Sequence, residues 1–222
     1  MHGERAYRGS MDMKRREVVQ LSVVVAVALV VMMLLRNHGP VGQDVRENTL
    51  AQKILADRSS PTVAQPSADL TLVVFTDYRC PACRKAYPEM RKAVAKDGRL
   101  RVVYKDWPIF GEKSERAAAV ALASTTQDIY PQVHHRLMTG RVETDDDLRI
   151  AVQRSGGDWS RLLDDLARRR SEIVTQLAHN RRQAFELGLP GTPGFLIGSV
   201  LVRGAMTEGE FLRAFERARE ER

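Results

Sequence analysis

The chain has 222 residues, of which 43% are hydrophobic and 28% are charged, and this composition argues against a fibrous or wholly disordered protein. Its formal net charge is +7, but 29 basic and 25 acidic residues remain once residues 1–36 are set aside. So small an excess of positive charge does not predict binding to nucleic acid. The two cysteines, Cys80 and Cys83, are too few for a framework of structural disulfides or a four-cysteine zinc site.

Residues 18–35 form an apolar run without a charged residue. As a helix the run would extend about 27 Å, close to the hydrocarbon thickness of a bilayer. Basic residues directly precede it, which favours a cytoplasmic N-terminus and an exported remainder. We therefore expect residues 1–17 to be a cytoplasmic basic segment and residues 18–35 a single transmembrane anchor.

Two other interpretations of this run stay open. The uninterrupted apolar core, residues 23–35, also has the length of a signal peptide, which would be cleaved. Export follows from both the anchor and the signal peptide. A buried helix of a soluble protein is the third possibility, and the adjoining basic cluster disfavours it.

Residues 36–68 contain prolines, glycines and scattered polar residues, and we expect them to form a tether with a short amphipathic helix within residues 44–57. Folded sequence begins near Asp69. The run LTLVVF at residues 70–75 predicts a buried strand, and LRVVY at residues 100–104 predicts a second one. A helix between them completes a parallel strand–helix–strand unit.

Residues 107–190 carry helical patterns almost throughout. The chain then returns to strands at residues 194–197 and 200–202, and Thr207 with Glu210 forms a capping box for a last helix. This order predicts one α/β domain, built from residues 69–106 and 191–222. The helical block at residues 107–190 is an insertion in it.

The motif Cys80-Pro81-Ala82-Cys83 opens the first helix of this domain. Two intervening residues allow the sulfurs to reach bonding distance across one helical turn. Unpaired N–H groups and the helix dipole stabilise a thiolate at Cys80, and proline suits the first helical position. Cys83 lies one turn further in, and we expect it to be the more buried, resolving thiol.

Other uses of this cysteine pair are half of a metal site shared by two chains and a small structural disulfide. A disulfide across so short a loop would stabilise the fold little, and the exported context favours redox chemistry. Nearby, Asp77 could accept a proton or cap the turn, and we favour the cap. We expect Lys105 to be a solvated charge.

Three stretches, LTLVVFTDYRCPACRKAYPEM, LRVVYKDWPIFGEKSERAAAVALA and GLPGTPGFLIG, resemble the DsbA-like thiol–disulfide oxidoreductases of the bacterial envelope, and the resemblance covers about residues 52–219. It implies a thioredoxin fold with an inserted helical domain. It also implies that Cys80 attacks and Cys83 resolves, and that Pro193 is a cis-proline opposite them. The backbone of Thr192 would then pair with an extended substrate segment, with Pro81 and Ala82 as further substrate contacts.

Two departures from the family concern oxidising strength. The best-known DsbA proteins have histidine at the position of Ala82 and a buried glutamate at the position of Val74. The direction of electron flow therefore stays open: an oxidase is the leading hypothesis, and a substrate-specific reductase is the alternative. Residues 36–68 are too few for the dimerisation domain of a DsbC-type isomerase, and we expect a monomer.

The resemblance implies an enzyme at the bacterial inner membrane with its catalytic domain in the periplasm. Its partners would be cysteine-containing exported proteins and a membrane redox partner of DsbB type, or a reducing membrane donor. No cofactor or metal is implied. From another class, a copper or zinc carrier using the two thiolates, or a holder of unfolded chains, is the alternative. Retention of copper without turnover of disulfides would mark such a binding module.

Overall fold

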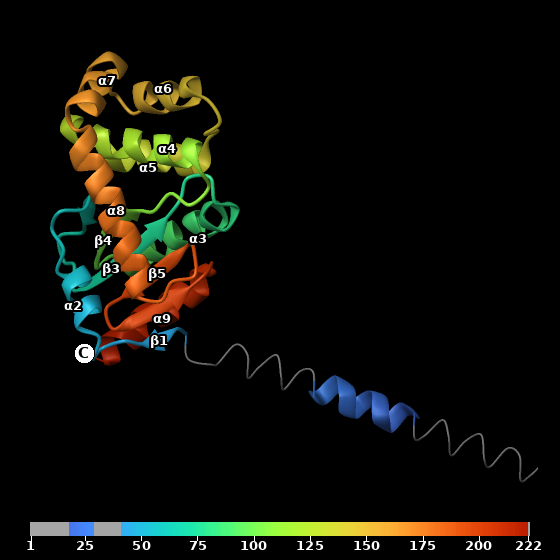
Figure 1. The fold of residues 1–222 in the computed structure, drawn as a ribbon. Coiled ribbons are helices and arrows are strands. Elements are labelled where there is room, and N and C mark those ends of the chain that lie inside the picture. Colours follow the sequence, from blue (N-terminus) through green and yellow to red (C-terminus); the bar gives the residue numbers. More distant parts are fainter. Residues whose placement is uncertain (1–17, 29–40, 222) are drawn as a thin grey trace, which may run out of the picture. The chain divides into compact units, whose positions relative to one another are not determined.

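The computed structural model describes residues 18–28 and 41–221 (Figure 1). Residues 18–28 are helical, and residues 41–221 make up a separate folded unit. Among the described residues, no helix is both long and apolar enough to cross a membrane. The anchor predicted at residues 18–35 continues into residues 29–35, which lie outside the described part of the chain, as do residues 1–17.

A mixed sheet of six strands forms the centre of the folded unit, in the order β1-β6-β5-β3-β4-β2. Strands β3 and β4 are parallel, and every other neighbouring pair is antiparallel. This arrangement confirms the predicted strand–helix–strand unit and the return of the chain to the same sheet. The strands are β1 (Gln43–Asp44), β2 (Thr62–Ala64), β3 (Leu70–Thr76), β4 (Leu100–Asp106), β5 (Gly194–Ile197) and β6 (Val200–Arg203).

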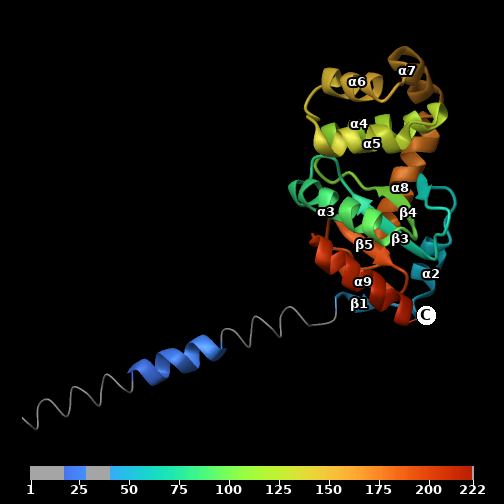
Figure 2. The same cartoon turned by 180° about the vertical axis from the view of Figure 1, so that it is seen from behind.

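Helices cover both faces of the sheet, and further helices gather at one end of the unit. Side chains of α3 and α9 pack in one core cluster, and side chains of α2 and α8 pack in the cluster on the opposite face. Helices α4 to α7 lie together at one end, and α8 runs from them back along the sheet (Figures 1 and 2). The helices are α2 (Thr49–Leu55), α3 (Pro81–Asp97), α4 (Glu112–Ala123), α5 (Tyr130–Thr139), α6 (Asp145–Arg154), α7 (Trp159–Arg168), α8 (Arg170–Glu186) and α9 (Glu208–Glu220), with a 3₁₀ turn at Ser124–Gln127.

The apolar run of β3 is explained by its central position. Leu72 and Val74 face the cluster of α3 and α9, whereas Val73 and Phe75 face the cluster of α2 and α8. A strand that is buried on both faces needs apolar residues at consecutive positions rather than at alternate ones. The thioredoxin-like fold with a helical block between β4 and β5 is therefore as predicted.

Local signals also place the helix ends where the sequence predicted them. Helix α3 begins after Cys80 and ends at Gly98, whose φ of 75° lies in the left-handed region that favours glycine. Thr207 and Glu210 form the predicted capping box of α9, with both reciprocal hydrogen bonds present. These boundaries depend on contacts within a few residues, which sequence patterns detect well.

The expected tether needs a correction, because much of it is folded. Within residues 36–68, strand β1 pairs with β6, strand β2 pairs with β4, and helix α2 lies between them. The short helix expected within residues 44–57 is present as α2, and its Ile54 is fully buried. The side chains of β1 and β2 are exposed, so their composition resembles that of a linker although their backbones extend the sheet.

Lys105 is a second correction, since its side chain is fully buried rather than solvated. It forms an ion pair with Asp57, a residue of the expected tether. Burial lowers the pKa of Lys105, and the hydrogen bond to Asp57 opposes that shift. Burial raises the pKa of Asp57, but its hydrogen bonds from Lys105 and Ser59 outweigh this and hold that pKa well below its usual range.

Replacing one partner of this pair should destabilise the folded unit. In the variant Asp57→Ala the Lys105 ammonium would be buried without a counter-charge, which typically costs about 3–5 kcal/mol. Urea denaturation should show this loss in the free energy of unfolding. The double variant Asp57→Ala/Lys105→Met removes the unpaired charge and should recover most of it. A single variant as stable as the wild type would contradict the role given to the pair.

Candidate active site

The CxxC motif occupies the junction between β3 and α3. Strand β3 ends at Thr76, and Cys80 is the residue that caps α3, with Pro81 at the first helical position. The Sγ atom of Cys80 accepts a hydrogen bond from the backbone N–H of Cys83 at 3.4 Å. Both cysteines are free thiols in this structure and both are buried, Cys80 to almost the same extent as Cys83. Cys83 was expected to be more buried than Cys80, but the exposed surface areas of the two residues are nearly equal.

The two thiols nevertheless differ strongly in acidity. A hydrogen bond from the Cys83 side chain, with further bonds from the backbone N–H groups of Cys83 and Ala82, overcomes burial and lowers the pKa of Cys80 to about 6. Burial and the hydrogen bond to Cys80 instead raise the pKa of Cys83 far above that of an ordinary thiol. At neutral pH the pair therefore holds one thiolate, on Cys80, beside one thiol.

The loop before β5 lies directly against this pair. Strand β5 runs antiparallel to β3 with Gly194 opposite Phe75, so the residues that precede β5 reach the turn that follows β3. The Thr192–Pro193 peptide bond is cis, as the resemblance implied. The carbonyl oxygen of Thr192 lies 3.3 Å from the Sγ of Cys80 and accepts a hydrogen bond from it when that sulfur is protonated. The Thr192 hydroxyl is buried and has no partner among the described residues.

The other predicted contacts flank the same sulfur. Pro81 is exposed and Ala82 is half-buried, so the first turn of α3 presents backbone and a small side chain to solvent beside Cys80. The structure thus brings together all of the residues that the sequence proposed for the site: Cys80, Pro81, Ala82 and Cys83 from one junction, and Thr192 and Pro193 from the loop before β5.

Asp77 has a larger structural role than the turn cap that we favoured. Its carboxylate accepts the N–H of Arg79 at 2.7 Å, which is the expected cap. It also accepts the N–H groups of Ile109 and Phe110, at 2.6 and 3.1 Å, and the hydroxyl of Ser114 at 2.8 Å. These bonds hold the loop after β4 against the CxxC turn. Sequence patterns give no sign of them, because the partners lie more than 30 residues apart.

Sequence patterns also give no sign of a buried polar network beneath the CxxC turn. The hydroxyl of Tyr78 lies 2.9 Å from Nδ1 of His134, and the hydroxyl of Tyr130 donates to Asp106 at 3.0 Å. Burial raises the pKa of Asp106 to about 7 and lowers the pKa of His134 to about 3. His134 is therefore neutral at pH 7.

Across residues 18–28 and 41–221, no cluster of three or more histidine, cysteine or acidic side chains could hold a metal ion.

Comparison with known proteins agrees with this geometry. Residues 57–217, well over half of the chain, match the Thioredoxin family model Thioredoxin_4. A thioredoxin-like oxidoreductase from Silicibacter pomeroyi DSS-3 is 33% identical with a TM-score of 0.71, over 78% of this chain and 98% of that one. The thiol-disulfide exchange protein α-DsbA2 from Wolbachia pipientis is 25% identical with a TM-score of 0.70, over 81% of this chain and 100% of that one.

Two further relatives differ in kind. A periplasmic thioredoxin-like protein from Salmonella enterica serovar Typhimurium is 29% identical with a TM-score of 0.66, and the match covers 77% of this chain and 97% of that one. The Na(+)/H(+) antiporter NhaA 1 of Mycolicibacterium gilvum is 26% identical over 162 residues. That match takes in 70% of this chain but spans only about a quarter, 26%, of the antiporter's length.

The family match, the solved relatives and the paired thiols at the β3–α3 junction lead to one conclusion. The chain belongs to the DsbA-like branch of the thioredoxin family and is a thiol–disulfide oxidoreductase whose CxxC pair is Cys80 and Cys83.

Proposed function

We propose that the chain is an envelope thiol oxidase that introduces disulfides into exported proteins. The observation that carries this proposal is the place of Cys80 at the amino end of α3, where its Sγ accepts the backbone N–H of Cys83 and its pKa is lowered to about 6. A stabilised thiolate favours the reduced form of the enzyme over its disulfide. The enzyme disulfide is then a better acceptor of electrons than one formed from ordinary thiols, as an oxidase requires.

The reaction begins with the Cys80–Cys83 disulfide and a substrate carrying two thiols. One substrate thiolate attacks the Sγ of Cys80, the Cys80–Cys83 bond breaks, and Cys83 leaves and takes up a proton, since burial raises its pKa. A second substrate thiolate then attacks the substrate sulfur of the mixed disulfide, and Cys80 leaves as the thiolate. The substrate has lost two electrons and two protons, and the enzyme has gained the two electrons.

The loop before β5 is assigned to substrate binding. The Thr192 carbonyl oxygen lies 3.3 Å from the Sγ of Cys80, so the backbone of Thr192 lies at the reacting sulfur. An extended substrate segment that pairs with this backbone would bring its own cysteine to Cys80. Pro193 contributes no N–H donor beside the thiols, and Pro81 and Ala82 form the opposite border of the contact.

The proposed location follows from the N-terminal sequence. Residues 18–35 are apolar and follow a basic cluster, which supports a single-pass anchor in the inner membrane with residues 41–222 in the periplasm. One solved relative is itself described as periplasmic. An anchored dithiol could be reoxidised by a quinone-linked membrane partner of DsbB type.

A substrate-specific reductase is the second candidate, and two residues favour it. Val74 and Ala82 stand where strongly oxidising relatives of DsbA type carry glutamate and histidine. The same steps would then run in reverse: the Cys80 thiolate attacks a substrate disulfide, Cys83 resolves the mixed disulfide, and a reducing membrane donor recycles the pair.

Single cysteine variants should separate the roles of the two thiols. Cys80→Ser should abolish turnover of disulfide or dithiol substrates, because no thiolate remains at the amino end of α3. Cys83→Ala should keep the nucleophile and lose the resolving thiol, so it should accumulate mixed disulfides with exported proteins. Non-reducing gel electrophoresis of cells expressing each variant measures this accumulation. Turnover by Cys80→Ser, or equal trapping by both variants, would contradict the assignment.

The acidity of Cys80 predicts a particular pH profile. Alkylation of the reduced chain by iodoacetamide should rise through a midpoint near pH 6, because only the thiolate reacts and the pKa of Cys80 is about 6. In Cys83→Ala the midpoint should move upward, since the hydrogen bond from Cys83 is the largest cause of the shift. Cys80→Ser is the control. Its remaining thiol, Cys83, should stay unreactive even at pH values well above 8.5, about the pKa of an ordinary cysteine. A wild-type midpoint near 8.5 would refute the stabilised thiolate.

A further inference from the structure

A group of arginines lines two hollows, one of which borders the CxxC turn at Pro81. We call it the basic strip, and it consists of Arg79, Arg84, Arg136, Arg141 and Arg154. The two hollows adjoin each other. One, of about 520 Å³, is lined by Pro81 of the motif together with Arg79, Arg84 and Arg141. The other, of about 400 Å³, is lined by Arg136, Arg141 and Arg154, so Arg141 borders both.

Arg84 gives the strip a charge that has no carboxylate partner within residues 41–221. Its guanidinium donates to the carbonyl oxygens of Tyr78, Leu137 and Gly140, at 3.2, 2.9 and 2.5 Å. These bonds connect the end of α5 to the CxxC turn, and so they fix the position of the walls that the two hollows share. Because every one of these acceptors is a neutral carbonyl, the positive charge of Arg84 is not cancelled.

The two carboxylates that line the hollows are already engaged. Glu143 accepts from both Arg79 and Lys113, at 3.1 Å each. Asp147 accepts the backbone N–H groups of Glu143 and Thr144 in the capping box of α6, at 3.0 and 3.1 Å. The strip therefore has an excess of positive charge that its own acidic side chains do not neutralise.

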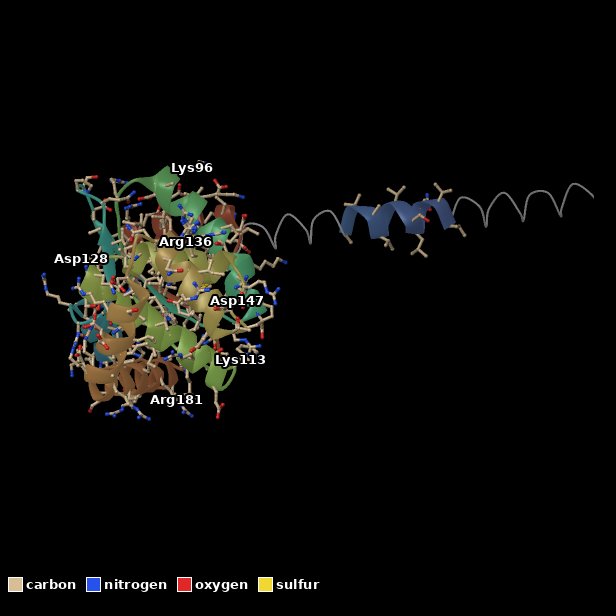
Figure 3. All side chains as sticks on the ribbon, turned by 90° about the horizontal axis from the view of Figure 1, so that it is seen from above. Lys96, Lys113, Asp128, Arg136, Asp147 and Arg181 are labelled. Carbon is tan, nitrogen blue, oxygen red and sulfur yellow. The ribbon has the colours of Figure 1, made fainter. Side chains whose placement is uncertain are left out.

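The exposed arginines of the strip are available to a ligand. Arg141 has 81% of its side chain exposed and lies 3.9 Å from Asp147, at the limit of an ion pair. Arg136 and Arg154 are exposed, and neither has an ion-pair partner among the described residues. Arg136 and Asp147 line the same hollow, and Figure 3 shows Arg181 of α8 apart from both, at the lower edge of the view.

We propose that the basic strip binds an acidic segment of the polypeptide whose cysteine reacts with Cys80. Guanidinium groups bind carboxylates with paired hydrogen bonds, and unpaired positive charge beside a reactive group raises its encounter rate with acidic partners. A polypeptide is the occupant because Pro81 lines the first hollow, next to the sulfur that must meet a protein substrate. This inference rests on the proposed function and names a class of substrate for it.

Matched peptides test the strip directly. Two synthetic dithiol peptides would be identical except that one has aspartates on one side of its cysteines and the other has asparagines there. The measured quantity is the second-order rate constant for oxidation of each peptide by the oxidised full-length chain in detergent. The aspartate peptide should react about tenfold faster at low ionic strength, and added salt should reduce this ratio.

Charge-reversal variants locate the effect. In Arg141→Glu/Arg154→Glu the ratio of the two rate constants should fall to about one or below it, because the strip then repels the aspartates. The control is Arg181→Glu/Arg182→Glu, which changes the net charge equally on exposed positions of α8 and should leave the ratio at its wild-type value.

The outcomes separate this inference from the proposed function. If the wild type oxidises neither peptide, the proposed oxidase fails and the inference fails with it. If both peptides react equally fast, the oxidase stands and the inference is overturned. Equal rates, combined with weaker binding of Arg141→Glu/Arg154→Glu than of the wild type to phosphatidylglycerol vesicles, would assign the strip to lipid headgroups instead.

Discussion

The position of Cys80 at the amino end of α3 is the constraint on which the rest of the structure depends. A thiolate is costly in a protein interior, and here the first N–H groups of a helix and a neighbouring thiol supply the compensation. This requires a helix that starts at the end of a buried strand. Strand β3 satisfies the requirement because it lies between β4 and β5, and β5 in turn brings Thr192 to the same sulfur. The asymmetry between an acidic Cys80 and a protonated Cys83 is a consequence of this one junction.

Much of this junction could be predicted from the sequence, because its signals are local. The apolar run of β3, the proline after Cys80 and the glycine that ends α3 each act within a few residues of the boundary they specify. Thr192 and Pro193 could be placed only through the family resemblance, since nothing in their own neighbourhood indicates that they meet a motif more than 100 residues away.

The features that escaped prediction depend on contacts between distant segments. The sequence of Lys105 and its neighbours predicts a surface charge, because the partner that buries it, Asp57, is distant in the chain. The sequences of β1 and β2 resemble a linker, because only their backbones take part in the sheet. The hydrogen bonds of Asp77 to Ile109, Phe110 and Ser114 likewise join segments that no sequence period connects. The same holds for the bonds of Arg84 to the carbonyls of Leu137 and Gly140. Polar residues in such places look alike in sequence whether they are solvated or buried, and only the fold distinguishes them.

Stabilisation of the Cys80 thiolate is the physical basis for assigning an oxidase to this chain, and it is directly measurable as a redox equilibrium. Titration with reduced and oxidised glutathione would give the reduction potential of the Cys80–Cys83 pair. A value well above that of thioredoxin, about −270 mV, and toward that of DsbA, about −120 mV, is expected because the thiolate stabilises the reduced form. A value close to that of thioredoxin, about −270 mV, would contradict the oxidase and indicate a reductase with a reducing partner in the membrane.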